Sequence, residues 1–323
     1  MAAPQPSPGD SPWRALSKQD LEKQYSPSRW SHRLNAEEVI KAHFRVGAEV
    51  TKEAQASKRS LLGVAYGEGD GEKLDIYFPA KTSEELPFFL FIHGGYWQEG
   101  SKDSSAFMVP PLTAAGVAVA VVAYDLAPKG NIDLMLSQVR RSAIFIQKQY
   151  SFNRGIYLCG HSAGAQLASM VLLTDWVEHE IIPNIKGFFL VSGIYDLEPI
   201  VHTYVNDILQ MTVEDAQRNS PMFCQKEAWS QVTSTCELIV AVGQYDSPEF
   251  LRQSLDYFQA LRLHGWRASF IEISNVDHFD IMEKLIQNEY ILTQEAMDRR
   301  KPRCSRHAAR WPSLKRSAFQ AAR

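Results

Sequence analysis

From residue 87 to about residue 293, short apolar runs alternate with longer amphipathic stretches. The runs are rich in Val, Ile, Leu and Phe and are too short for helices, so they predict buried strands. Strands that alternate with helices are typical of an α/β fold, in which helices cover both faces of a mostly parallel sheet. The predicted strands are residues 88–92, 117–123, 155–159, 187–191, 237–242 and 268–273, and the predicted helices are residues 134–150, 163–173, 249–263 and 280–293.

The first third of the chain adds a helix and two strands. Asn35 followed by Glu38 resembles a helix-capping pair, and apolar residues recur after it at helical spacing. We expect this helix to end near Gly47 and to pack over the main domain. Residues 61–66 and 73–78 have the pattern of strands, and the glycines between them suit a turn that needs positive φ.

Length and composition fit one large domain, because 323 residues with 45% hydrophobic and 22% charged side chains can build a single core. The start of the chain is rich in Pro and Ser, so residues 1–19 are expected to be disordered. Residues 20–294 are expected to form the domain, with a helical excursion or cap at 201–230. Residues 295–323 are basic and aperiodic, and they are expected to form a disordered tail.

Charge and cysteine content narrow the classes of partner. A net charge of -3 argues against binding to nucleic acid or an anionic membrane, and no apolar stretch approaches the roughly 18 residues of a membrane span. The opening residues lack the basic start and apolar run of a secretory signal, so a cytosolic location is expected. The four cysteines form no C-x-x-C pair, which favours neither a zinc site nor a disulfide framework. A small-molecule partner is expected.

Gly160-His-Ser-Ala-Gly164 stands between a predicted strand and a predicted helix. In this setting a G-x-S-x-G sequence makes a sharp turn that projects the serine hydroxyl out of the sheet, and its glycines let neighbouring backbone pass close by. The helix N-terminus also favours developing negative charge. Ser162 is therefore the candidate nucleophile of a serine hydrolase.

A serine hydroxyl needs a base and an acid that orients the base, and in the α/β-hydrolase fold these follow the serine in the order acid, then histidine. Asp246 follows the predicted strand 237–242, and His278 follows the strand 268–273. Both would lie at the carboxyl edge of the sheet, where ligand sites occur. Four other residues compete for these roles, namely Asp277 and Glu249 as the acid and His202 and His264 as the base.

His93-Gly-Gly-Tyr-Trp97 follows the third predicted strand. The α/β-hydrolase fold takes oxyanion-hole amides from this loop and from the residue after the nucleophile. The backbone N–H groups of Gly94, Gly95 and Ala163 are therefore the candidate donors to a tetrahedral oxyanion.

Taken together, the His93 to Trp97 motif, the Gly160 to Gly164 motif, Asp246 in an Asp-Ser-Pro-Glu-Phe segment and His278 resemble the kynurenine formamidase (arylformamidase) family over about residues 20–290. The Trp of H-G-G-x-W distinguishes this family from related hormone-sensitive-lipase-like esterases, which usually have a third glycine near that position. The resemblance implies Ser162 as nucleophile, Asp246 as acid and His278 as base.

The resemblance also implies a reaction and a setting. The reaction is the hydrolysis of N-formyl-L-kynurenine to L-kynurenine and formate in tryptophan breakdown, without a metal or organic cofactor. The setting is a homodimer in the cytosol and also in the nucleus. Tyr96 and Trp97 are candidates to stack on the aromatic leaving group, although core packing is the more common role of such residues.

The chain departs from the family pattern after Gln294, where apolar spacing gives way to a basic segment. This tail could replace packing residues and impair the enzyme, and its run 299–303 could act as a nuclear address or contact nucleic acid, although such runs are usually solvated. Two alternatives to a formamidase stay open. One is a short-chain carboxylesterase with the same machinery, and the other is an impaired relative that only binds ligand.

Overall fold

The computed structural model describes residues 12–56, 59–81, 85–181, 183–224 and 236–298. Its centre is an eight-stranded sheet in the order β1-β2-β4-β3-β5-β6-β7-β8. β1 and β2 form an antiparallel hairpin, β2 pairs antiparallel with β4, and all later pairs are parallel. The strands are β1 Ser60–Ala65, β2 Lys73–Tyr77, β3 Pro87–Ile92, β4 Ala118–Val122, β5 Gly155–His161, β6 Ile185–Val191, β7 Glu237–Gly243 and β8 Arg267–Ile273.

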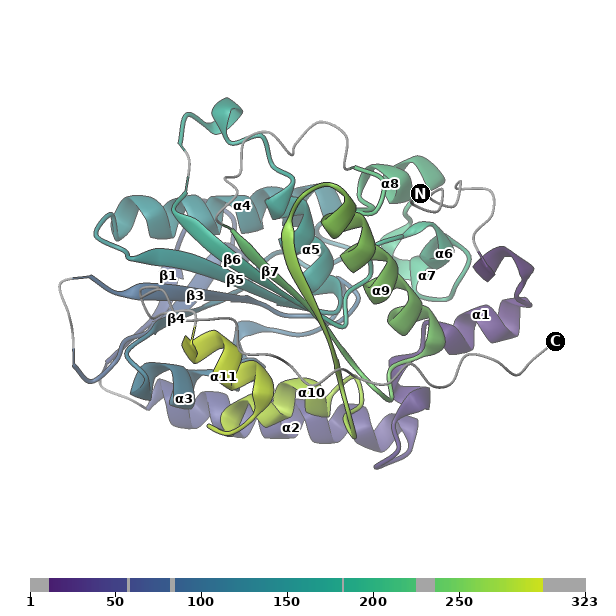
Figure 1. The fold of residues 1–323 in the computed structure, drawn as a ribbon, viewed down its shortest axis with the longest axis horizontal. Helices are drawn as coiled ribbons and strands as arrows, with labels where there is room; N and C mark the ends of the chain where they lie inside the picture. Colours follow the sequence, from purple (N-terminus) through teal and green to yellow (C-terminus); the bar gives the residue numbers. More distant parts are fainter. Residues whose placement is uncertain (1–11, 57–58, 82–84, 182, 225–235, 299–323) are drawn as a thin grey trace.

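Helices cover both faces of this sheet (Figure 1). The α-helices are α1 Lys18–Gln24, α2 Ala36–Gln55, α3 Val109–Ala114, α4 Ile132–Gln149, α5 Ala163–Leu172, α6 Glu198–Val201, α7 Asn206–Leu209, α8 Val213–Arg218, α9 Pro248–Leu263, α10 Asp280–Glu283 and α11 Ile291–Asp298. Short 3-10 turns are η2 Pro12–Ala15, η3 Pro27–Trp30, η4 Lys102–Ser104, η5 Val177–His179 and η6 Lys284–Ile286. The expected α/β-hydrolase architecture is confirmed.

The core has two layers because successive strand residues point to opposite faces. On β3, Phe88 and Leu90 face the layer of α4, α5 and α9, whereas Phe89 and Phe91 face the layer of α2, α3, α10 and α11. All six residues of this strand are buried, as expected of a strand covered on both sides. The carboxyl ends of β3, β5, β7 and β8 consequently meet at one edge between the two layers.

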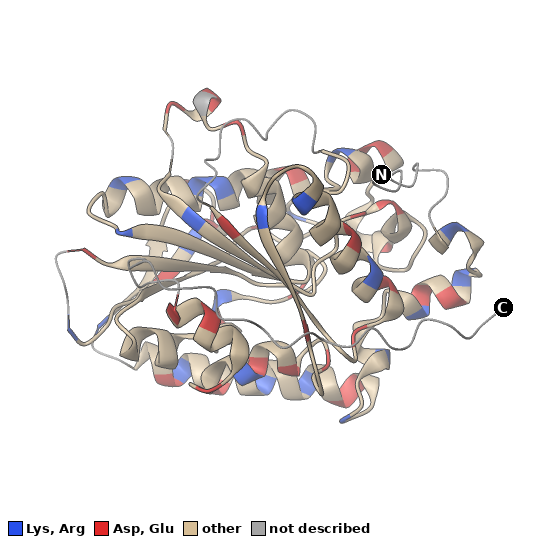
Figure 2. Ribbon diagram, in the orientation of Figure 1, with Lys and Arg blue, Asp and Glu red and all other residues tan. Residues whose placement is uncertain are grey.

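Acidic and basic residues alternate along α2 and α9, whereas α4 has one acidic residue in its first turn and basic residues after it (Figure 2). No helix in the described part of the chain combines the length and the apolarity needed to cross a membrane.

Two predicted helices have different bounds in the structure. The N-terminal helix does not end at Gly47 but continues to Gln55, because this glycine is a packing residue: a Cβ there would lie 2.2 Å from the carbonyl oxygen of Ser104. The predicted helix 280–293 is broken into α10, η6 and α11, since Gln287 has an extended conformation. Leu285 and Leu292, on either side of the break, are both buried in the core layer of α2, α3, α10 and α11.

The expected disorder of residues 1–19 is wrong for 12–19. Trp13 is 5% exposed and stacks on His202 with ring centroids 5.5 Å apart, so this apolar side chain fixes the start of the chain. At the other end α11 continues through Asp298, beyond the expected boundary at 294. Residues 1–11 and 299–323 lie outside the described residues. The predicted cap at 201–230 corresponds to the short helices α6 to α8 as far as residue 224.

Candidate active site

Ser162 occupies the turn between β5 and α5, with φ 55° and ψ -119°. Only close backbone packing can hold a non-glycine residue in this strained conformation. A Cβ on Gly160 would lie 2.1 Å from the carbonyl oxygen of Gly164, and a Cβ on Gly164 would lie 2.1 Å from that of Ile92. Both glycines of the motif are therefore required by contacts, and the resulting elbow presents Ser162 at the carboxyl edge of the sheet.

His278 and Asp246 lie on the loops that follow β8 and β7, and the structure brings them together. The Nδ1 atom of His278 is 2.6 Å from Oδ1 of Asp246. The other oxygen, Oδ2, accepts hydrogen bonds from the hydroxyl of Ser192 at 2.7 Å and from the N–H of Gly243 at 3.0 Å. Asp246 is thus held on both sides, and a neutral His278 ring bonded through Nδ1–H keeps Nε2 as a proton acceptor.

The two competing acids are engaged elsewhere. Asp277 accepts hydrogen bonds from Ser31 and Arg33 at 2.7 and 2.9 Å. Burial raises the pKa of Asp277, but these bonds and those from its own loop outweigh it and lower the pKa below its ordinary value. Glu249 accepts a hydrogen bond from the Tyr25 hydroxyl at 3.0 Å and pairs with Arg252 at 2.8 Å. Each carboxylate therefore has a structural partner.

The competing histidines are also remote from the serine. His202 stacks on Trp13, and His264 caps the end of α9 with its ring 2.8 Å from the carbonyl oxygen of Ala260. Of the three histidines, His278 is the one that lines the same cavity as Ser162.

The glycine loop after β3 approaches the serine from the opposite side. A Cβ on Gly94 would lie 2.9 Å from the Cβ of Ser162, and Gly95 has φ 104°, a conformation that favours glycine. Among the described residues, none accepts a hydrogen bond from the N–H of Gly94, Gly95 or Ala163. Unpaired backbone donors beside a nucleophile are the arrangement that an oxyanion hole requires.

His93 lines the cavity, but its ring is engaged by the loop itself. Its Nδ1 is 2.8 Å from the carbonyl oxygen of Gly94, and its ring stacks on Tyr124 with centroids 4.5 Å apart. Burial lowers the pKa of His93 to about 4, so the ring is neutral near pH 7 and donates through Nδ1–H to that carbonyl. A Cβ on Gly100 would lie 2.6 Å from this nitrogen, which closes the loop around the imidazole.

Of the two candidates for stacking on the substrate, Trp97 does not line the cavity. Trp97 is 0% exposed, its Nε1–H donates to Oε1 of Gln166 at 3.1 Å, and it belongs to the core. Tyr96 does line the cavity, and its hydroxyl donates to the carbonyl oxygen of Tyr25 at 2.8 Å. Tyr96 and Trp97 both have positive φ, of 49° and 59°, and their rings consequently point in different directions.

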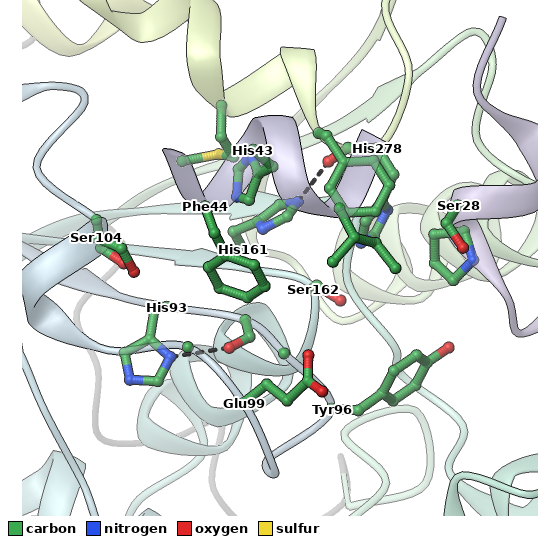
Figure 3. A pocket seen from close by; sticks show the side chains of 18 of the residues that line it. Ser28, His43, Phe44, His93, Tyr96, Glu99, Ser104, His161, Ser162 and His278 are labelled. Atoms are coloured by element: carbon green, nitrogen blue, oxygen red, sulfur yellow. Dashed lines mark hydrogen bonds between the residues drawn. The ribbon is translucent and has the colours of Figure 1, made fainter. Parts of the chain in front are cut away.

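Ser162 and His278 open into a cavity of about 310 Å³, a size suited to a small organic ligand (Figure 3). One side, the sheet wall, consists of Gly94, Gly95, His161, Ser162 and His278. The opposite side, the outer wall, comes from the N-terminal segment and the cap, and it consists of Ser26, Pro27, Ser28, Ile40, His43, Phe44, Tyr204 and Val205.

Sequence reasoning missed the outer wall and His161. The outer wall belongs to elements without a recognisable motif, and no local signal places them over the sheet edge. His161, inside the serine motif, donates through Nε2–H to the backbone carbonyl of His278 at 2.9 Å. Burial, reinforced by the neighbouring His278 and His43, lowers the pKa of His161 well below its ordinary value. This neutral ring fixes the backbone of the His278 loop.

Within the described residues, no group of three or more His, Cys, Asp or Glu side chains could hold a metal ion. The described arrangement can supply a nucleophile, a base held by a carboxylate, and oxyanion donors, all from side chains and backbone.

Comparison with known proteins gives consistent matches. A family model described as BD-FAE matches residues 74–235. The chain is 52% identical to the kynurenine formamidase of Salmo salar over 87% of this chain and 96% of the relative. It is 29% identical to the kynurenine formamidase of Drosophila melanogaster over 82% of this chain and 92% of the relative.

Solved structures extend the likeness to esterases. A candidate thioesterase from Silicibacter sp. TM1040 has a TM-score of 0.71 at 26% identity, covering 85% of this chain and 98% of its own. A hyperthermophilic esterase from Pyrobaculum calidifontis has a TM-score of 0.63 at 18% identity, covering 87% of this chain and 93% of its own, and it shares the fold alone.

Proposed function

The chain belongs to the kynurenine formamidase family, and from this membership we propose that it hydrolyses N-formyl-L-kynurenine to L-kynurenine and formate. The observation that carries the proposal is 52% identity to a kynurenine formamidase over nearly the full length of that relative. The unpaired amides of Gly94, Gly95 and Ala163 beside Ser162 support the same chemistry, because hydrolysis of an amide develops an oxyanion at this position.

The first half of the reaction transfers the formyl group to the enzyme. Ser162 Oγ attacks the formyl carbon while His278 Nε2 takes the hydroxyl proton, and the carbonyl oxygen becomes an oxyanion bound by the amides of Gly94, Gly95 and Ala163. The C–N bond then breaks, and His278 returns the proton to the departing arylamine nitrogen. The products of this half are L-kynurenine and a formyl ester of Ser162.

The second half repeats the proton transfers with water. His278 removes a proton from a water molecule, the hydroxide attacks the ester carbon, and collapse of the second oxyanion releases formate and restores the Ser162 hydroxyl. Asp246 holds Nδ1–H throughout and stabilises the imidazolium that forms in each half. Its role is supported by the 2.6 Å contact with His278 and by the two donors that fix its other oxygen.

The cavity suits an aromatic leaving group with a polar tail. Phe44, Phe107 and Phe279 supply apolar surface, while Ser26, Ser28 and Tyr204 supply hydroxyls. Tyr96, held by its hydroxyl bond to Tyr25, is the remaining candidate for contact with the substrate ring.

The central test is hydrolysis of N-formyl-L-kynurenine by the purified full-length chain and by Ser162→Ala. We expect the wild-type protein to release kynurenine and formate, and the variant to lose at least about 10⁴-fold in kcat. Turnover that is unaffected by the substitution would sink the assignment of the nucleophile.

A short-chain carboxylesterase remains the second candidate, because the solved relatives include an esterase of the same fold. Kinetics with p-nitrophenyl acetate and with formanilide separate the two functions. A formamidase is expected to favour the formamide, and efficient cleavage of the ester alone would favour the alternative.

A homodimer in the cytosol, with a nuclear fraction, is proposed on the family resemblance alone. Light scattering of the purified chain and imaging of a tagged chain test these two points.

The basic segment 299–323 lies outside the described residues, whereas Leu292 of α11 is 2% exposed and packs in the core layer of α2, α3, α10 and α11. Removing residues 299–323 is therefore expected to leave formamidase activity intact, and a large gain in activity would support an impairing tail.

A further inference from the structure

Glu99 is the single carboxylate among the residues that line the active-site cavity, and no Lys or Arg lines it. Figure 3 shows its side chain pointing into the space between Ser162 and Tyr96. Glu99 is exposed, so it lies at the solvent side of the cavity. Among the described residues, none forms a hydrogen bond or an ion pair with its carboxylate, and the nearby Lys102 pairs with Asp75 and Asp103 instead.

The backbone that carries Glu99 is held firmly. Its own N–H and that of Gln98 both donate to the carbonyl oxygen of Gly95 at 2.9 Å. The Gln98 side chain donates to the carbonyl oxygen of Val205 at 2.6 Å, which ties this turn to the outer wall. Gly100, with φ 91°, packs against His93. The same turn therefore positions the Gly95 amide and an unpaired negative charge.

We propose that Glu99 is a specificity residue that binds the ammonium group of the substrate's amino-acid tail. The inference rests on the proposed function, because N-formyl-L-kynurenine carries an α-ammonium and an α-carboxylate several bonds away from the formyl carbon. These two charges must lie at a wall of the cavity while Ser162 attacks. A wall with one free carboxylate and no cation favours the ammonium and repels the carboxylate.

The selection acts on substrate charge. The substrate carboxylate is left to water or to the hydroxyls of Ser26, Ser28 and Tyr204, of which Ser26 and Tyr204 already bond to each other at 3.1 Å. An aryl formamide with only an ammonium tail should therefore be a better substrate than one with only a carboxylate tail. Because Glu99 is exposed, this preference should weaken as salt is added.

The test compares three aryl formamides with the same reacting group. One has an ortho tail –CO–CH2–CH2–NH3⁺, the second has –CO–CH2–CH2–COO⁻, and the third is formanilide, which has no tail. For wild-type protein we expect kcat/KM to favour the amine tail over the acid tail, and Glu99→Gln should reduce that ratio by roughly tenfold, mainly through KM. Glu53→Gln on α2, an exposed charge change outside the cavity lining, is the matched control and should leave the ratio unchanged.

A binding measurement makes the inference independent of turnover. In the Ser162→Ala background, calorimetry with the amine-tailed and the acid-tailed formamide should show the same preference, and adding Glu99→Gln should remove it. Equal binding of the two compounds, or equal loss of kcat/KM on all three substrates, would overturn the role of Glu99. Absence of any formamide hydrolysis by the wild-type chain would instead contradict the proposed function, while the charge preference in binding would still decide the role of Glu99.

Discussion

The two walls of the cavity are built in different ways. The sheet wall consists of residues at strand ends, so Ser162 and His278 inherit their positions from the parallel ladders of β5 and β8. The outer wall comes from α2, the turn at Ser26 to Ser28, and the cap. It is joined to the rest of the protein by separate side-chain contacts, such as Tyr96 to Tyr25 at 2.8 Å and His43 to Glu283 at 3.0 Å.

This difference assigns the catalytic step to the sheet wall and the choice of substrate to the outer wall. A shift of about an ångström at a strand end would break buried backbone hydrogen bonds between neighbouring strands. The sheet wall is therefore suited to hold the groups that must keep a fixed position relative to the reacting atoms. The outer wall lacks such a ladder, and its residues can change with smaller structural cost. Substitutions in the sheet wall should therefore reduce kcat, whereas substitutions in and around the outer wall should act on KM and stability.

After the loss of Ser162 itself, the largest effect is expected from Asp246→Asn. The amide would present an N–H group to Nδ1 of His278 and favour the wrong tautomer, so kcat should fall about 10⁴-fold with little change in KM. Steady-state kinetics with N-formyl-L-kynurenine measure this loss, and circular dichroism checks the fold. A loss below about tenfold would mean that Asp246 does not orient the base.

Gly95→Ala should have the next largest effect. A Cβ at this position would lie 2.3 Å from the carbonyl oxygen of Glu99 at φ 104°, so the amide must move and kcat should fall about 10²- to 10³-fold. Gly265→Ala is the matched control, because φ there is 85° and nothing lies within 4 Å of the new Cβ. This control should lose stability and keep kcat, and equal kcat losses in the two variants would contradict a role for the Gly95 amide.

Arg33→Met tests the ion pairs that connect the N-terminal segment to the loop of His278 and to α10. Arg33 bonds to Asp277, beside His278, and to Glu283, so its loss leaves a buried carboxylate without its cation and should cost about 2 to 3 kcal/mol of unfolding free energy. Activity should fall less than in Gly95→Ala. Urea unfolding at pH 7 measures the difference, with Arg45→Met, an exposed residue on the same N-terminal segment, as the control.

The effect of Arg33→Met should depend on pH with a defined sign. The folded-state pKa of Asp277 is lowered, so its stabilising contribution is present above the unfolded pKa of about 3.9 and is lost as the pH falls toward the folded value. The gap in stability between wild type and variant should therefore shrink below about pH 4. A gap that is constant from pH 7 to pH 3 would contradict an ionic contribution from this contact.

Trp97→Phe should have the smallest effect. The ring belongs to the core, and the substitution leaves Oε1 of Gln166 without its donor, so stability should fall by about 1 to 2 kcal/mol. The KM for N-formyl-L-kynurenine should stay within about twofold of wild type, because a residue outside the cavity lining contributes no binding energy to remove. A several-fold rise in KM at unchanged stability would restore the idea that Trp97 contacts the substrate.

The sequence by itself determined the strands, the serine turn and the order of the candidate triad. These are local signals: period and length identify a buried strand, and Gly160 and Gly164 mark a turn whose close contacts are with residues next in the chain or with the neighbouring strand. Because parallel strands run in the same direction, their carboxyl ends place Asp246 and His278 at one edge of the sheet without further information.

Only the tertiary structure decided which of two aspartates holds His278, where Gly47 packs, and which residues form the outer wall. Asp277 is bonded to Ser31 and Arg33, about 245 positions earlier in the chain, and Gly47 packs against a carbonyl oxygen of η4. Trp97 is a core residue because its ring meets α5 and not the cavity. These contacts join residues that are far apart in the sequence and depend on how the helices pack against the sheet. The pattern of apolar and polar residues along the chain does not specify which helix surfaces pack together.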